Sequence, residues 1–431
     1  MNPVARSAAL QRRQVLVLLT ALSALAFMDR QIIAVLIQPV KAEFGLSDLQ
    51  IGLVTGLGYA LTFALIGVPL GRRADRGGRR NLVAWCRGLG GLLAALGGAA
   101  SGFWTLMASR AGGAISDAGA APASMSMLAD LYPPEQRSRA MSVFGTGGSI
   151  GALLAMVVGA WLAQRYGWRA TVVLVGSSTL GLSALLRFGV TEPARAAVPT
   201  APAALAAAEL QGGAVGAIWR EPVTRWLIVA AACALLAGYA FGTWNTALLV
   251  RRHGLSLQGA GWVSGTAALA SVLGGLAAGA LTDHLTRRDL RWQIGVPMLG
   301  VGIALPCALA YLALPVGAIA PAVALVTAFA FFITWWAAPA YAALSLIVPP
   351  QRRATASAIL MLAGAVLASG LGPILTGGLS DVLEARLPGD GLRIALACMV
   401  GMLLPGLFAF ARVRATYPAA HRALHPAALP R

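Results

Sequence analysis

Four charged residues fall inside apolar stretches of this sequence that are long enough to cross a lipid bilayer. Asp29 and Arg30 are adjacent in the first stretch, and Arg110 precedes Asp117 by seven positions in the fourth. A lone charge at the centre of a bilayer costs at least about 2.5 to 3.5 kcal/mol, so these residues must face a cavity and compensate one another. We predict that Asp29 and Asp117 carry a coupling proton and that Arg30 and Arg110 bind an anionic group.

Helical geometry is compatible with a single site. Seven residues correspond to about 700° of rotation, so Arg110 and Asp117 share a face and lie roughly 10 Å apart along the axis. Asp29 lies about 22 Å into its own helix, at a depth between them. The alternative is a static ion pair that fixes the first helix against the fourth. Arg87 is nearer to the end of its apolar stretch and is expected to extend toward the membrane surface.

The composition predicts an all-α membrane protein. Of 431 residues, 58% are hydrophobic and 11% are charged, a ratio that a soluble domain could not solvate. At about 20 apolar residues per crossing, the length fits one bundle of 12 to 14 helices. Twelve stretches are predicted to span the membrane: 14–40, 49–71, 80–102, 104–131, 138–163, 168–190, 224–250, 257–281, 291–313, 317–348, 354–382 and 392–412.

The basic residues indicate the topology. The formal net charge is +18, and most arginines fall in segments that are cytoplasmic if the N-terminus is cytoplasmic. This distribution argues against nucleic acid as a partner and favours contact with membrane lipids. We expect a multi-pass protein of a bacterial inner membrane with both termini in the cytoplasm, acting as a monomer.

Residue types that would support catalysis are missing at membrane depth. The four histidines lie in loops or in the tail, and the four cysteines are far apart in apolar runs. Intramembrane enzymes need nucleophiles or metal ligands clustered inside the spans. We therefore predict neither an enzyme nor a metal site, and no cofactor, with a proton gradient as the energy source.

Internal repetition divides the chain. GLSDLQIGLVTG at 45–56 recurs as GLSLQGAGWVSG at 254–265, and GVPLGRRADRGGRR at 67–80 recurs as GLAAGALTDHLTRR at 275–288. A repeat that keeps its register over several helices predicts two pseudo-symmetric six-helix halves, which suits a transporter better than a receptor or scaffold. The halves would be 1–190 and 223–431, joined by a cytoplasmic linker at 191–222.

The loops after the second and eighth spans combine glycine pairs with charges. Gly67 with Gly71, and Gly275 with Gly279, are spaced to let another helix approach closely. The loops that follow are predicted to close the cytoplasmic face, although their arginines could serve only as topology anchors. The predicted gate residues are Gly71, Asp75, Arg76, Arg79, Arg80, Asp130, Arg137 and Asp283.

The second half replaces the charges with aromatic residues. By the repeat, Asp29 and Arg30 correspond to Gly238 and Tyr239. Charges on one wall and aromatic rings on the other suit a substrate with a polar head and an apolar body. The substrate contacts predicted in this half are Tyr239, Trp244, Asn245, Trp335 and Trp336. The alternative for the tryptophan pair is an anchor that faces lipid.

These motifs resemble a known family. GRRADRGGRR at 71–80 is similar to the loop signature of the major facilitator superfamily, and YGWRA at 166–170 is another phrase common there. The resemblance covers nearly the whole chain. It implies the twelve-helix major facilitator fold, alternating access by rocking of the two halves, and a loop that locks the outward-facing state.

Within that superfamily the chain is most similar to the spinster-like lipid transporters. The resemblance rests on Asp29-Arg30 followed by KAEFGLSDLQIGLVTG, and on Arg110 with Asp117, where that family usually carries Glu. It implies proton-coupled transport of an amphipathic anion or zwitterion such as a lysophospholipid. Organic-anion (carboxylate) proton symporters remain an alternative. A drug-efflux antiporter fits less well, because GTGGSIGALLAMVVG in the fifth span lacks the usual Gly-Pro phrase.

Overall fold

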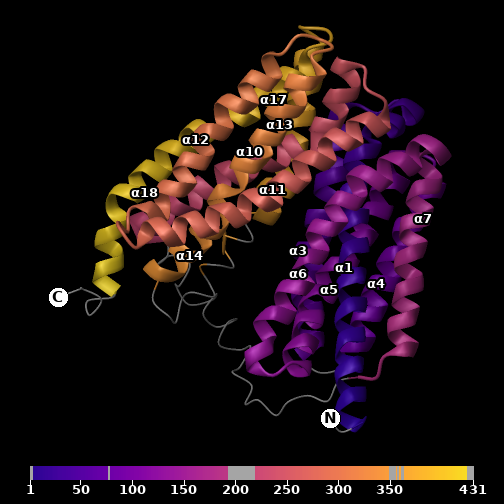
Figure 1. Ribbon diagram of the computed structural model, residues 1–431. Helices are drawn as coiled ribbons and strands as arrows, with labels where there is room; N and C mark the ends of the chain where they lie inside the picture. Colours follow the sequence, from indigo (N-terminus) through magenta and orange to yellow (C-terminus); the bar gives the residue numbers. More distant parts are fainter. Residues whose placement is uncertain are drawn as a thin grey trace. The chain divides into compact units, whose positions relative to one another are not determined.

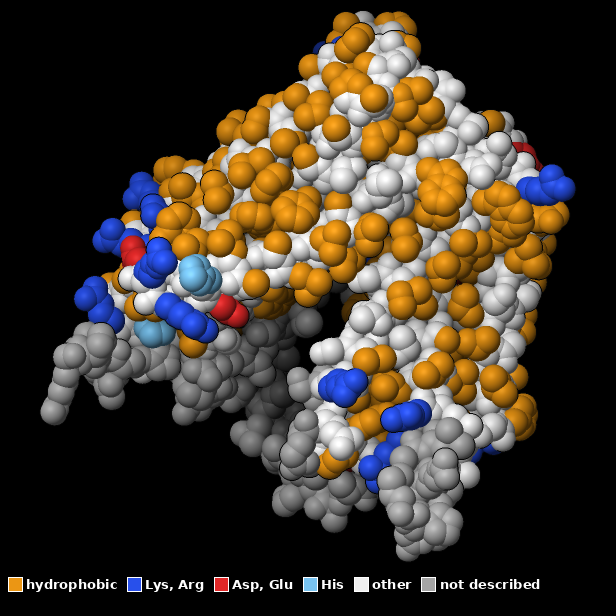
Figure 2. Space-filling view, viewed as in Figure 1, with side chains coloured by type: hydrophobic (Ala, Val, Ile, Leu, Met, Phe, Trp, Pro, Cys, Tyr) orange, Lys and Arg blue, Asp and Glu red, His pale blue; other side chains and the backbone are white. Residues whose placement is uncertain are grey.

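The structure is a computed structural model, and it describes residues 3–75, 78–192, 219–348 and 364–424, with Ala356, Ile359 and Leu360. The regular secondary structure of these residues is helical (Figure 1). Nine helical segments within the described residues are long and apolar enough to cross a membrane. Hydrophobic side chains cover much of the face shown in Figure 2, as expected of a surface in contact with lipid tails. The chain is an integral, multi-pass membrane protein.

Each of the first six predicted spans coincides with helical structure. Gly167, whose φ is 81°, interrupts the last helix between the fifth and sixth spans, in a conformation that glycine adopts without steric cost. The elements are α1 (Pro3–Phe44), α2 (Asp48–Gly52), η1 (Leu53–Leu57), α3 (Gly58–Asp75), α4 (Arg79–Leu96), η2 (Gly97–Ala99), α5 (Phe103–Leu131), α6 (Pro134–Leu154), η3 (Ala155–Gly159) and α7 (Ala160–Gly189).

The remaining six spans also coincide with helices, the eleventh only in its described part. A short 3-10 turn, η4, interrupts the tenth span. The elements are α10 (Pro222–His253), α11 (Leu257–Thr286), α12 (Trp292–Ala313), α13 (Ile319–Ile333), η4 (Thr334–Trp336), α14 (Ala337–Ile347), η6 (Gly364–Leu371), α16 (Gly372–Glu384), α17 (Gly391–Gly401) and α18 (Leu403–Leu424).

The chain forms two compact units. The first comprises Met1–Ala197 with Asn245–Gly265, and the second comprises Val198–Trp244 with Thr266–Arg431. In the first unit α4 packs against α5 and α7, and α3 packs against α5; in the second, α12 packs against α13 and α18 (Figure 1). The repeat predicts a boundary between the halves at the linker, but the compact units divide the chain differently, since 245–265 packs with the first unit. The boundary at the linker therefore stays a prediction.

Glycines allow α4 to approach its neighbours closely. A Cβ added to Gly176 of α7 would lie 2.5 Å from the carbonyl oxygen of Gly91 and 2.6 Å from the backbone nitrogen of Ala95. A Cβ on Gly90 would lie 2.6 Å from the Cβ of Ser116 on α5. The backbones of these helices therefore touch almost directly, which fixes the position of every side chain that α4 carries.

The Gly176→Ala variant is expected to destabilise the protein. The added methyl group would force α4 and α7 apart, at a cost of about 1 to 3 kcal/mol in the free energy of unfolding. Gly181→Ala, on the same helix, is the matched control, because no atom of the described residues lies within 4 Å of its added Cβ. The measurement is the thermal unfolding of the purified protein. Equal unfolding temperatures for the two variants would contradict the close packing.

For three of the four paired glycines, the described residues show no close neighbour, so their predicted packing role stays a prediction. A Cβ on Gly67, Gly275 or Gly279 would meet no atom of the described residues within 4 Å. The contact glycine on α11 is Gly274, whose added Cβ would lie 2.0 Å from the carbonyl oxygen of Phe331. A shift of one residue rotates a position by about 100° around the helix, so Gly274 and Gly275 face different surroundings.

Candidate functional site

Asp29 of α1 and Arg110 of α5 form a buried ion pair. The Nη1 atom of Arg110 lies 3.1 Å from Oδ1 of Asp29, and its Nη2 donates to the backbone oxygen of Asp29 at 2.8 Å. The two residues are 8% and 6% exposed. An added Cβ on Gly113, the residue one turn beyond Arg110, would lie 3.3 Å from Oδ2 of Asp29, so a small residue leaves room for the carboxylate. The structure thus brings together two of the four predicted residues directly.

Asp117 pairs with a residue that the sequence analysis set aside. Nη1 of Arg87, on α4, lies 2.7 Å from Oδ1 of Asp117 and 3.0 Å from the hydroxyl of Ser116. Arg87 is 2% exposed, so the prediction that it extends to the membrane surface is wrong. The physical reason is the close approach of α4 and α5 beside Gly90, which encloses the guanidinium group beside a carboxylate.

Tyr59 links Arg30 to the second ion pair. Its hydroxyl donates to Oδ2 of Asp117 at 2.7 Å, and the guanidinium carbon of Arg30 lies 4.4 Å from the centre of its ring. A cation over an aromatic face is attracted by the ring quadrupole. The ring of Phe63 stacks on Tyr59 at 6.1 Å. Sequence reasoning missed Tyr59, which carried no signal beyond being a polar group in an apolar helix.

We call these residues the charged cluster: Asp29, Arg30, Tyr59, Arg87, Arg110 and Asp117. They come from α1, α3, α4 and α5 of the first unit. Three guanidinium groups accompany two carboxylates, so the ionised cluster carries one excess positive charge. An anion entering it would restore neutrality in a medium of low dielectric constant.

Three of the predicted substrate contacts lie on α10. Trp244 is fully buried, and its Nε1 donates to the carbonyl oxygen of Pro373 on α16 at 3.2 Å. Asn245 is buried and Tyr239 is half-buried. The indole of Trp244 therefore has a packing role in the second unit besides any contact with a substrate.

The two adjacent tryptophans of η4 have different surroundings. Trp335 and Trp336 are 8% and 6% exposed, so the alternative that they face lipid is wrong. Trp335 packs with Ala278 and Val296, and its ring lies 5.0 Å from that of Phe332. Trp336 instead lies 6.4 Å from the ring of Tyr341. This placement assigns Trp335 to the apolar core of the second unit.

Part of the predicted gate is held together at the start of α4. Arg79 is buried, and its guanidinium group donates to the carboxylate of Asp130 on α5. The backbone nitrogens of Arg79 and Arg80 both donate to the carboxylate of Glu192 at 2.9 Å, and Arg80 also donates to the carbonyl oxygen of Val190 at 2.7 Å. A carboxylate at a helix N-terminus is stabilising, so Glu192 ties the end of α7 to α4.

The other predicted gate residues are not brought together by the described part of the chain. Arg137 and Asp283 are exposed. Gly71 and Asp75 lie on α3, but the structure describes only their place in the helix and not their surroundings. Arg76 lies outside the described residues. A gating role for Asp75 therefore stays a prediction.

Another buried carboxylate was missed by sequence reasoning. Asp48, at the start of α2, is 2% exposed and binds the guanidinium group of Arg251 through two contacts of 2.7 Å. Nζ of Lys41 lies 2.5 Å from the same carboxylate. These contacts join α1, α2 and the end of α10 within the first unit. The sequence did contain a signal for it: the second copy of the repeat has Leu257 where the first has Asp48, so the repeat itself does not require an acidic residue at this position.

The Asp48→Asn variant is expected to lower the free energy of unfolding by about 2 to 3 kcal/mol, because two cations would lose their shared charge partner. The loss is smaller than for a fully buried pair, because the side chains of Lys41 and Arg251 are 31% and 26% exposed. Asp390→Asn is the control: its contact with Arg393 is also 2.7 Å but more exposed, so its loss should cost less than about 1 kcal/mol. Similar thermal unfolding of both variants would argue against a special role for Asp48.

Similar proteins match most of the chain. The family model for the Major Facilitator Superfamily matches residues 19–373. A protein named as an MFS-type efflux pump from Mycolicibacterium smegmatis is 33% identical over 404 residues, 93% of this chain and 92% of that protein. A probable galactarate/D-glucarate transporter from Bacillus subtilis is 24% identical over 320 residues, 68% of this chain and 69% of that protein.

Among solved structures, a bacterial homolog of the human lysosomal transporter Spinster, in an inward-facing and unoccupied conformation, is similar with a TM-score of 0.80. The two chains are 26% identical, and the match covers 96% of this chain and 98% of the other. The predicted twelve-helix fold and the similarity to spinster-like transporters are thereby confirmed. The chain is a transporter rather than an enzyme, and it belongs to the Major Facilitator Superfamily.

Proposed function

We propose that this transporter moves an amphipathic or organic anion, or a zwitterion, coupled to protons. The observation that carries the proposal is the excess positive charge of the charged cluster, in which three arginines accompany two aspartates. Guanidinium groups bind carboxylates and phosphates through two parallel hydrogen bonds. The amphipathic substrate is what the resemblance to spinster-like transporters implies, and a Spinster homolog is among the similar solved structures.

The ion pair of Asp29 and Arg110 provides a means of coupling. A proton that binds Asp29 removes the negative charge from the pair and leaves the Arg110 guanidinium group available to an anion. Proton and anion then favour each other's binding, and this coupling is reciprocal by thermodynamic linkage. Asp117 can act on Arg87 and Arg30 in the same way. In the alternative, in which the ion pairs are static and only hold the helices together, they would bind neither a proton nor an anion.

For the apolar body of the substrate, Trp336 is the better candidate of the tryptophan pair, since Trp335 packs in the core of its unit. Tyr239, Trp244 and Asn245 stay proposed contacts. Aromatic rings offer a large apolar surface and, in tyrosine and tryptophan, a polar tip, which suits an amphipathic molecule.

The relatives support two other substrate classes. The similarity to a sugar-acid transporter favours an organic carboxylate, which would use the same arginines. The similarity to an efflux pump extends over 93% of this chain and supports an exported compound.

We further propose that the protein lies in a bacterial inner membrane as a monomer with both termini in the cytoplasm, and that the loop after α3 closes the cytoplasmic face.

The experiment uses the full chain reconstituted in vesicles with an imposed pH gradient. Lysophospholipids, sugar acids, aromatic acids and lipophilic cations are offered separately. The proposal expects accumulation of an anion or zwitterion that stops when a protonophore removes the gradient. Transport of lipophilic cations alone would contradict the proposal and indicate drug efflux instead. Anion transport that is insensitive to the protonophore would contradict proton coupling but would agree with the proposed substrate class.

A further inference from the structure

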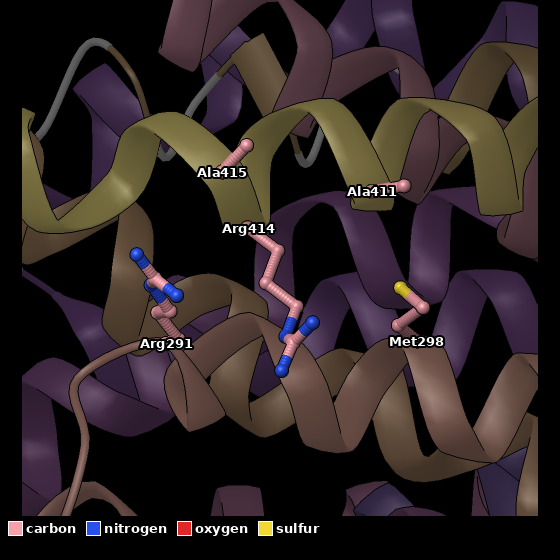
Figure 3. Close-up of a pocket in the computed structure, with 5 residues that line it drawn as sticks. All are labelled: Arg291, Met298, Ala411, Arg414 and Ala415. Atoms are coloured by element: carbon pink, nitrogen blue, oxygen red, sulfur yellow. The ribbon is translucent and has the colours of Figure 1, made fainter.

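The second unit has a pocket that the proposed transport does not use. It lies between the start of α12 and the second part of α18 and has a volume of about 260 Å³. Its lining, shown in Figure 3, consists of Arg291, Met298, Ala411, Arg414 and Ala415. Arg291 directly precedes α12, while Arg414 extends from α18 toward α12 (Figure 3). Two arginine side chains therefore line one pocket together with Met298 and two alanines.

Neither guanidinium group has a carboxylate partner within 4.0 Å among the residues that the structure describes. The nearby carboxylate of Asp289 accepts a hydrogen bond from the backbone nitrogen of Arg291 at 2.9 Å. Nε of Arg414 is buried and has no acceptor in the described part of the chain. The ring of Trp292 lies 5.9 Å from the Arg414 guanidinium carbon. A buried donor without an acceptor, such as Nε of Arg414, favours an external anion.

The surroundings add to the positive charge. The segments 281–292 and 408–424 contain six arginines but only two acidic residues, Asp283 and Asp289. Figure 2 shows basic side chains gathered at one end of the second unit. Such a concentration attracts anionic groups over a distance of about 10 Å at 0.1 M salt.

The position of the pocket along the helices points to a lipid. The membrane spans predicted from the sequence begin at 291 and end at 412, so the arginines lie at the expected boundary of the bilayer. Farther along the same helices, Leu299, Leu404 and Phe408 are 44%, 59% and 52% exposed, as lipid-facing residues are. A molecule that occupied the pocket would meet charge at one end and apolar surface at the other.

We infer that this pocket binds the phosphate headgroup of an anionic glycerophospholipid, with Arg291 and Arg414 as the phosphate ligands. The headgroup phosphate accepts charge-assisted hydrogen bonds from the two guanidinium groups. The acyl chains lie against the apolar surfaces of α12 and α18 beyond Met298. This site is separate from the charged cluster, all of whose residues belong to the first unit.

The test is lipid retention by the full-length protein. The purified protein is incubated with phosphatidylglycerol or with phosphatidylcholine of the same acyl chains, and bound lipid is counted by native mass spectrometry. Phosphatidylglycerol should be retained in preference. Arg291→Gln and Arg414→Gln should each weaken its binding about fivefold, and the double variant about 25-fold, since each basic residue near an anionic surface contributes about 1 kcal/mol.

Arg412→Gln is the matched control. It removes the same charge two residues away on α18, but Arg412 lies over the ring of Phe408 and is not part of the pocket lining. It should change retention less than twofold. Arg110→Lys should leave retention unchanged, which separates this site from transport. Unfolding temperatures verify that each variant is folded, and the single variants give the test should the double variant not fold.

Three outcomes would overturn the inference. Equal retention of phosphatidylcholine would show that charge does not select the lipid. An equal loss in Arg412→Gln would assign the effect to the general basic surface. Complete displacement of the lipid by an equimolar amount of inorganic phosphate would show a site for a free anion, in which the acyl chains contribute nothing.

Discussion

Replacing Asp117 with asparagine is expected to abolish uptake driven by a pH gradient while leaving exchange of substrate across the membrane. Asparagine keeps the shape of the side chain and one oxygen, which can accept from Arg87 as Oδ1 of Asp117 does at 2.7 Å. Its amide nitrogen takes the place of Oδ2 and can donate to the hydroxyl of Tyr59, which lies 2.7 Å from Oδ2 in the unmodified protein. It cannot bind a proton, so the gradient would lose its means of driving the cycle. The measurement compares gradient-driven uptake with counterflow exchange in the same vesicles.

Two further variants make the result decisive. Asp117→Glu keeps a titratable carboxyl group and should keep gradient-driven uptake. Asp390→Asn, in an exposed pair with Arg393, should behave like the unmodified protein. Loss of a partner from a fully buried ion pair costs about 3 to 5 kcal/mol, and the loss here is smaller because the Asp117 side chain is 16% exposed. The folded state of Asp117→Asn is verified by its elution from a sizing column. Gradient-driven uptake that persists in a folded Asp117→Asn protein would show that this aspartate carries no coupling proton.

The Arg110→Lys variant is expected to weaken substrate binding about 10- to 100-fold, although the positive charge is kept. Arg110 uses two nitrogens at once, at 3.1 Å and 2.8 Å from Asp29, and still has other donors for an anionic group. A lysine offers a single point charge and cannot present a planar fork. A loss of one or two charge-assisted hydrogen bonds, at about 1.5 to 3 kcal/mol, gives the expected range. The measurement is equilibrium binding in detergent with the substrate found in the vesicle panel.

Arg169→Lys is the control for this substitution. Arg169 is also in the first unit and pairs with Glu43 at 2.6 Å, but its side chain is 38% exposed. Binding should be unchanged there. If the Arg110→Lys protein binds the substrate with unaltered affinity, Arg110 is not part of the anion site. Its ion pair with Asp29 would then only hold α1 against α5.

The fold was largely predictable because its signals are local. Apolar stretches of sufficient length specify membrane helices, and a repeated motif specifies two related halves, without knowledge of any contact. The same holds for charges at depth, since burial in a bilayer makes an unpaired charge costly whatever its partner is. This reasoning selected Asp29, Arg30, Arg110 and Asp117, of which the structure pairs Asp29 directly with Arg110.

The pairing itself was not predictable, because it depends on how helices rotate against one another. Arg87 meets Asp117 only because Gly90 lets α4 approach Ser116. Among the described residues, the glycine of α11 that lies close to Phe331 of α13 is Gly274 and not its neighbour Gly275. The same rotation separates Trp335 from Trp336 and places two cations around Asp48. The sequence by itself determined the helices, the two related halves and the need to neutralise charges in the membrane. Only the tertiary structure decided which residues neutralise one another, because one position along a helix turns a side chain by about 100°.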